Sequence, residues 1–153
     1  MSFLLKYLLI GHIFIGLTGI ILFYAVLMVL LKTIDDKRIK LLRRLSLWGF
    51  ISFVLSWISG GYYYVQYYGD KVKPIIKAGN YPWAHTIIME AKEHIFLFLP
   101  FAALAITLLF YFLGDKIEQN QNIKKSAILL SVIIVIIGTL MALMGIMISG
   151  AVK

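Results

Sequence analysis

The sequence has 153 residues, of which 61% are hydrophobic, and its formal net charge is +8. With a mean hydropathy of +0.92, this composition excludes an ordinary soluble domain. The chain contains no cysteine, which excludes disulfides, iron–sulfur clusters and covalently attached c-type haem. The basic charge calls for no nucleic acid, because lysines and arginines beside membrane helices bind anionic lipid headgroups.

Four apolar segments follow one another along the chain. They run over residues 3–31, 45–66, 83–113 and 126–152. About 20 helical residues, at ~1.5 Å each, cross the ~30 Å hydrocarbon core of a bilayer. The connections between the segments leave no room for a second domain. We therefore expect residues 1–153 to form a single all-α domain, an integral membrane four-helix bundle in contact with the lipid bilayer.

The lysines and arginines in the connections and near the two termini predict the orientation. The first and third connections carry 6 + 3 = 9 of them, and the second connection with the two termini carries 3 + 1 + 1 = 5. They are Lys32, Lys37, Arg38, Lys40, Arg43, Arg44, Lys116, Lys124 and Lys125 on one side, and Lys71, Lys73, Lys77, Lys6 and Lys153 on the other. The positive-inside rule then predicts a multi-pass protein of the plasma (inner) membrane with both termini outside.

The second connection, residues 62–83, is rich in tyrosine and also contains Trp83. Aromatic residues gather at membrane–water interfaces, so an aromatic belt is the simplest interpretation. The alternative is a platform for a ring-shaped ligand such as a quinone, or for an external redox protein.

The third segment begins "WAHTIIMEAKEHIFLFLP" and carries His85, Glu90, Lys92, Glu93 and His94 within ten positions. Ionisable groups at membrane depth normally face the interior of a bundle and indicate a functional site. At about 100° per residue, Glu90 and His94 share one face of a helix, whereas His85 and His94 point to opposite sides.

In the first segment, His12 shares a helical face with Gly16 and Gly19. His12 and His94 each lie about a dozen residues from the outer end of their helix, which predicts one depth, ~15–18 Å from those ends. Two imidazoles on separate helices at one depth are what bis-histidine ligation of haem requires. Gly16 and Gly19 would leave space for the flat macrocycle, and Trp57 would line it.

These residues, in "GHIFIGLTG" and "MEAKEHIF", give the chain a general resemblance to the four-helix integral-membrane b-type cytochromes. The resemblance covers the architecture of the whole chain. It implies haem b bound by His12 and His94, and electron transfer involving quinone or an external redox partner. Many such cytochromes have four ligand histidines, whereas this chain has three, which implies one haem.

A non-haem metal is a second interpretation. Glu90, Glu93 and His94 would bind a single Cu, Zn or Fe ion together with His12. His85 is a further candidate metal ligand, although a histidine at headgroup level also hydrogen-bonds to lipid or water. The remaining acidic residues all lie in connections, which argues against a di-iron carboxylate site.

A third interpretation involves no redox chemistry. The cluster of Glu90, Lys92, Glu93 and His94 would then serve as a proton or ion path in a small membrane protein or in an accessory subunit. A homo-oligomer or a place in a larger membrane complex is compatible with each interpretation. The sequence contains no nucleophile–base pair and no phosphate-binding loop, so it does not decide whether the chain is an enzyme.

Overall fold

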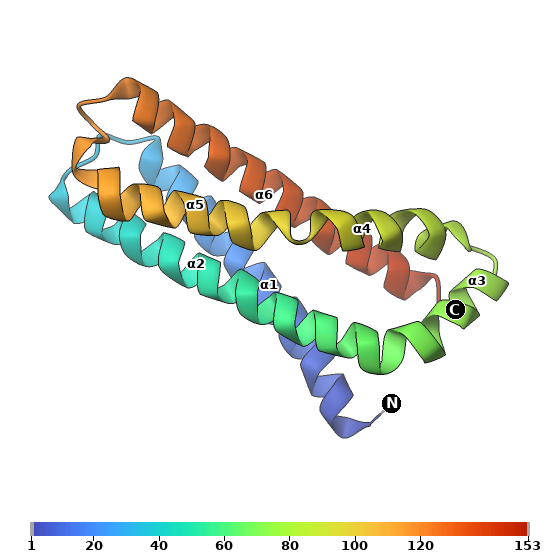
Figure 1. The fold of residues 1–153 in the computed structure, drawn as a ribbon. Helices are drawn as coiled ribbons and strands as arrows, with labels where there is room; N and C mark the ends of the chain where they lie inside the picture. The colour runs from blue at the N-terminus through green and yellow to red at the C-terminus, as the bar shows by residue number, and fades with distance from the viewer. Residues whose placement is uncertain (1, 153) are drawn as a thin grey trace.

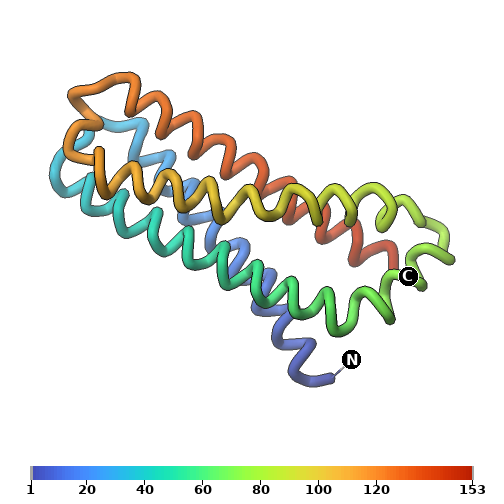
Figure 2. Tube along the Cα trace, viewed as in Figure 1, coloured from blue at the N-terminus to red at the C-terminus, as the bar shows by residue number. Residues whose placement is uncertain are grey.

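The computed structural model describes residues 2–152 and is all-α in this range. Four long helical rods run antiparallel to their chain neighbours (Figure 1). Both termini lie at one end of the bundle, here called the terminal end, and the connections around residues 31–35 and 114–120 lie at the other, the loop end (Figure 2). The elements are α1 (Phe3–Leu30), α2 (Asp36–Tyr63), η1 (Tyr64–Val72), α3 (Lys73–Ala78), η2 (Ala84–Met89), α4 (Glu90–Ile95), α5 (Phe98–Leu113), η3 (Gly114–Lys116) and α6 (Gln121–Gly150).

The four rods are long and apolar enough to cross a membrane, which agrees with the expected membrane bundle in contact with lipid. They cover Phe3–Leu30, Asp36–Ala78, Ala84–Lys116 and Gln121–Gly150. The second rod begins nine residues earlier than the predicted start at residue 45. Asp35 caps it by accepting a hydrogen bond from the Arg38 backbone N–H at 2.8 Å, and Ile39 and Leu42 are buried, so this charged stretch folds as an amphipathic helix.

The predicted connection over residues 62–83 is mostly helical. The π-helix η1 continues α2 directly, α3 follows it, and a second π-helix, η2, begins the third rod. Helical structure is interrupted only between Ala78 and Ala84. This cap forms because Tyr68, Val72 and Ile76 are buried against the last turns of α6, a tertiary contact that the tyrosine-rich composition did not indicate.

Small residues let α1 and α2 approach closely. A Cβ at Gly19 would lie 2.7 Å from the Phe53 ring, and a Cβ at Gly49 would lie 2.6 Å from the Phe23 ring. The two rings are buried and stack in parallel, with centroids 5.6 Å apart and an interplanar angle of 6°. Each helix thus provides a glycine that receives the other's aromatic ring, as expected for packing between membrane helices.

The third rod is interrupted at Phe96 and Leu97, where α4 ends and α5 begins (Figure 1). Pro100 lies in the first turn of α5, where the absence of its N–H is tolerated because those donors have no intrahelical partner. The Leu99 N–H instead reaches the Phe96 carbonyl at 3.3 Å. The interruption lies beside the cavity described below, in the half of the bundle nearer the termini.

Polar contacts join the two connections at the loop end. Arg43 pairs with Asp115 at 2.9 Å and donates to the Phe110 carbonyl at 2.9 Å. The Glu118 carboxylate accepts from the Ile34 N–H at 2.9 Å and from Lys124 Nζ at 2.8 Å. These contacts hold the short turns against each other, so the loop end is tied while the terminal end is more open.

Candidate functional site

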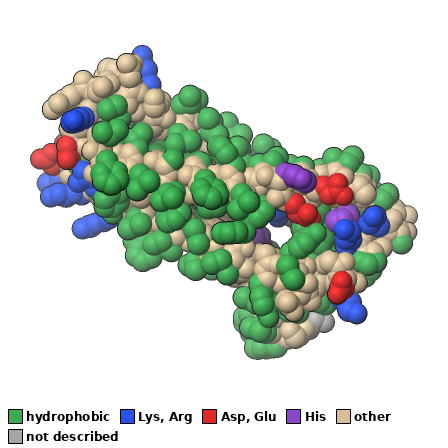
Figure 3. Space-filling view, viewed as in Figure 1, with side chains coloured by type: hydrophobic (Ala, Val, Ile, Leu, Met, Phe, Trp, Pro, Cys, Tyr) green, Lys and Arg blue, Asp and Glu red, His purple; other side chains and the backbone are tan. Residues whose placement is uncertain are grey.

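A cavity lies in the terminal half of the bundle, between α1, the junction of α2 with η1, α4 and α6. Figure 3 shows the hollow in the side of the molecule between α4 and this junction. The cavity has two adjoining lobes that share His12, Trp57, Lys92 and Ser149 in their walls. The inner lobe, of about 340 Å³, extends toward the middle of the bundle. The cap lobe, of about 720 Å³, extends toward the tyrosines of η1.

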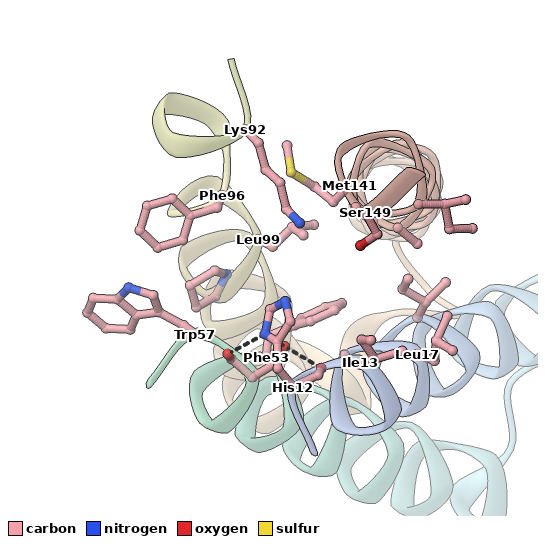
Figure 4. A pocket seen from close by; sticks show the side chains of 18 residues that line it. His12, Ile13, Leu17, Phe53, Trp57, Lys92, Phe96, Leu99, Met141 and Ser149 are labelled. Carbon is pink, nitrogen blue, oxygen red and sulfur yellow. Dashed lines mark hydrogen bonds between the residues drawn. The ribbon is translucent and has the colours of Figure 1, made fainter. Parts of the chain in front are cut away.

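His12 is held by α2. Its Nδ1 lies 2.8 Å from the Ser56 carbonyl oxygen, and the Ser56 hydroxyl donates to the His12 carbonyl at 3.0 Å. A carbonyl only accepts hydrogen bonds, so Nδ1 carries the proton and the Nε2 of the neutral ring keeps a free lone pair. Nε2 points into the cavity (Figure 4). The seat is tight, because a Cβ at Gly60 would lie 2.5 Å from His12 Nδ1.

Lys92 approaches the same space from α4. Its side chain runs into the cavity toward His12, and the Ser149 hydroxyl lies at the α6 wall (Figure 4). Gly145 leaves room for the amine, since a Cβ there would lie 3.3 Å from Lys92 Nζ. Within residues 2–152, no ion pair or hydrogen bond is recorded for the Lys92 side chain. One donor and one acceptor therefore face each other across a mostly apolar cavity.

Glu93 lines the cap lobe together with Tyr64 and Tyr68. Its Oε1 is shielded from solvent and has no hydrogen-bond partner. Tyr68 is 3% exposed, and its hydroxyl lies 3.1 Å from Nδ1 of His85, which is 1% exposed. His85 Nε2 is the only other buried side-chain nitrogen or oxygen in residues 2–152 that lacks a partner. Such unsatisfied atoms are rare and gather at functional sites.

Glu90 and His94 lie outside the cavity, although both belong to the predicted cluster. Both are exposed, and His94 Nδ1 donates back to the Glu90 carbonyl at 2.6 Å within α4. Lys92 and Glu93 face inward from the same helix. The four residues proposed as one proton or ion path are thus divided between two faces. His85 is buried and His94 is exposed, so the two histidines of the third rod have different surroundings.

The structure does not bring the predicted haem ligands together. His12 faces the cavity, whereas His94 is absent from its walls. Gly16 lines the inner lobe, but a Cβ there would meet the Ser56 hydroxyl at 2.9 Å, and Gly19 faces Phe53. Both glycines therefore make room for α2. Bis-histidine ligation by His12 and His94 does not fit this arrangement.

The other predicted site residues are placed as follows. Trp57 lines both lobes, and its ring lies 6.1 Å from that of Phe96. No group of three or more His, Cys, Asp or Glu side chains within residues 2–152 is arranged to hold a metal ion. The expected single-ion site at Glu90, Glu93, His94 and His12, with His85 as a further ligand, therefore has no geometric support.

Sequence reasoning missed several residues that shape the site. Ser56 and Gly60 form the seat of His12, and Tyr68 is the partner of His85. In the sequence, Ser56 and Gly60 are small residues four positions apart in the second segment, a spacing that is typical of helix packing and gives no sign of a histidine partner. Only the pairing of α1 with α2 reveals their second role.

Comparisons of the chain with protein-family models, with curated proteins and with solved structures give no match. Function must therefore be inferred from the residues around the cavity.

Proposed function

We propose that this membrane protein binds a lipid-soluble quinone, in its quinol form, within the terminal half of the bundle. A ring hydroxyl donates to His12 Nε2, and the same oxygen accepts from Lys92 Nζ. The observation that carries the proposal is this pair of side chains from α1 and α4, one acceptor and one donor, directed into one cavity. A hydroxyl group satisfies both partners, whereas a simple carbonyl satisfies Lys92 alone.

The walls of the cavity support a ring-shaped, lipid-soluble ligand. Both lobes fall within the ~300–1,000 Å³ range of small-molecule sites, which are apolar with a few polar groups that fix orientation. Trp57 and Phe96 supply aromatic surface. Ile13 and Ile146 line the inner lobe and are also exposed, at 48% and 69%, so a ligand reaches the cavity from the bilayer.

The site lies near one boundary of the hydrocarbon core. From Glu93 to Asp115 the third rod advances 22 residues, or ~33 Å, about the thickness of the hydrocarbon core. Because Asp115 pairs with Arg43 at the loop end, Lys92 and Glu93 lie near the opposite boundary. Glu90 and His94 then face headgroups and water. On the positive-inside rule this boundary is the outer face of the plasma membrane, with both termini outside.

A haem is the second candidate, and the orientation of His12 favours it. A ligand histidine typically donates its other ring N–H to a backbone carbonyl, as His12 does to Ser56. His12 would be the single histidine ligand, because His94 lies outside the cavity. Electron transfer through haem b remains a prediction from the resemblance to membrane cytochromes. An external redox protein would meet the cap over residues 62–83, where Tyr62, Tyr81 and Trp83 are exposed.

Tryptophan quenching tests the quinone proposal. Purified protein in detergent, in a Trp48→Phe and Trp83→Phe background that leaves Trp57 as the single tryptophan, is titrated with a reduced short-tailed benzoquinone while the emission of Trp57 is followed. Lys92→Met and His12→Phe should each weaken binding at least about tenfold, the effect of losing one charge-assisted or well-oriented hydrogen bond. Glu90→Gln and His94→Gln, on the outward face of α4, are the matched controls and should bind normally. Quenching that never saturates, or equal losses in the controls, would refute the site.

The visible spectrum of the same preparation tests the haem candidate. If haem is present, its absorption disappears in His12→Ala and persists in His94→Ala, because only His12 reaches the cavity. Loss of the signal in His94→Ala would restore the bis-histidine arrangement. A colourless protein that binds quinol would leave quinone binding as the function.

A further inference from the structure

We infer that the inner lobe holds the isoprenoid tail of the bound quinone, so that this protein selects tailed quinones over tail-less rings. The inference rests on the proposed quinone site and adds the part of the ligand that the site discriminates. It follows from how the two lobes meet and from what lines each of them.

The two lobes differ in chemistry. The cap lobe is walled by the tyrosines of η1 and by Glu93, together with apolar side chains such as Val65, Met89 and Ile148. The far part of the inner lobe is walled by apolar or small side chains, which are Ile20, Phe53, Leu99, Gly138, Met141 and Ala142. No charged group lies among these six. A hydrocarbon chain fits this part, and a polar ring substituent does not.

Apart from Ser56, whose hydroxyl is hydrogen-bonded to the His12 carbonyl, the polar groups of the inner lobe lie where it meets the cap lobe. His12, Lys92 and Ser149 line both lobes and therefore lie at their junction. A ring oxygen held there by His12 and Lys92 places the ring in the wider cap lobe. Its substituent chain then enters the smaller inner lobe, whose lining beyond the junction contains no charged side chain.

The inner lobe also provides an exit for a long tail. Ile13 and Leu17 on α1 and Ile146 on α6 line the lobe and are 48%, 41% and 69% exposed on the outside of the bundle. They form a rim in the gap between α1 and α6. The first units of the tail lie in the lobe, and the remainder continues into the bilayer.

The test uses three quinols with one ring and with no, one or two isoprene units. Wild-type protein should bind more tightly as units are added. Ala142→Leu fills the inner lobe and should weaken binding of the two-unit compound about tenfold, the cost of overpacking one apolar site. Binding of the tail-less ring should stay unchanged. Ala105→Leu, on the exposed face of α5, is the matched control.

A second variant tests the same inference independently, in case Ala142→Leu does not fold. Leu17→Phe narrows the lobe from its exposed rim, away from the buried core and without adding a tryptophan, and should show the same selectivity. Equal affinities for all three compounds in wild type, or equal losses for tailed and tail-less compounds in both variants, would overturn the inference while leaving the ring site intact. Failure of wild type to bind any of the three would overturn the quinone proposal with it.

Discussion

At the scale of single residues, the site depends on small side chains that make room for large ones. Gly60 is the clearest case, because a Cβ there would lie 2.5 Å from His12 Nδ1, whereas Gly61 has no atom within 4 Å of its would-be Cβ. Gly60→Ala should displace the imidazole, cost about 1–3 kcal/mol of stability and weaken quinol binding. Gly61→Ala should change neither. Thermal melts and the Trp57 titration measure both effects, and equal behaviour of the two variants would contradict the proposed seat of His12.

Glu93 illustrates an energetic cost at the candidate site. A shielded carboxylate oxygen without a partner destabilises the fold by about 1–3 kcal/mol. Glu93→Leu should therefore raise the melting temperature, because it removes the unsatisfied oxygen and adds apolar contact. It should also alter ligand binding, because the cap lobe loses a polar group. Glu90→Leu changes an exposed position on the same helix and should leave ligand binding intact. A lower melting temperature for Glu93→Leu would show that this carboxylate stabilises the bundle.

At the scale of elements, the pairing of α1 with α2 positions the site. Gly19 packs against Phe53, and Gly49 packs against Phe23. About two turns closer to the N-terminus of α1, the same interface holds His12 against Ser56. Gly49→Ala should destabilise the protein by about 1–3 kcal/mol, because the buried Phe23 ring must move. Gly11→Ala, with nothing near its would-be Cβ, is the control. Unfolding in denaturing detergent measures both, and an unchanged Gly49→Ala would argue against this interface.

The π-helical segments are the elements that the sequence did not reveal. η1 and η2 carry Tyr68 and His85, which are hydrogen-bonded to each other, so the two segments meet at this contact. π-helical turns are rare in proteins, and those that do occur are often found at functional sites. They keep the second and third rods helical through residues that composition alone marks as a connection. Periodicity at 3.6 residues per turn does not predict them.

At the scale of the whole molecule, the loop end contains a titratable contact outside the membrane. The hydrogen bond from Lys124, followed by that from the Ile34 N–H, lowers the pKa of Glu118 from its ordinary value of 4.5. The stabilising contribution of Glu118 is therefore fully present above that ordinary pKa and is lost as the pH falls through the lowered value. Glu118→Gln should remove this component of acid sensitivity in melts recorded against pH. An unchanged acid sensitivity in Glu118→Gln would contradict this role of Glu118.

The orientation in the membrane is a second whole-molecule prediction. Tags at either terminus should be cleaved by protease added to intact cells, and tags in the connections around residues 33 and 119 should be protected. The physical reason is the excess of lysine and arginine at the loop end, which the positive-inside rule predicts to stay on the cytoplasmic side. The opposite cleavage pattern would place the cavity near the inner face instead.

The sequence by itself determined the class of the protein. Four apolar stretches long enough to cross a bilayer require helices, because lipid satisfies no backbone polar group. It also indicated His12 and Lys92 as ionisable residues in apolar surroundings, since that conflict is visible in a linear pattern. The depth of a residue along a helix is counted directly from the sequence, and this made His12 and the third-segment cluster neighbours in height.

Only the tertiary structure decided which side each residue faces. His94 and Lys92 are two positions apart, and the rotation of α4 sends one outward and the other into the cavity. That rotation is set by the interruption at Phe96 and Leu97 and by the buried cap of Tyr68, Val72 and Ile76. Contacts between segments far apart in the chain fix both features. Helical periodicity gives the angles between the side chains of one helix. It does not show which of those side chains point toward the interior of the bundle.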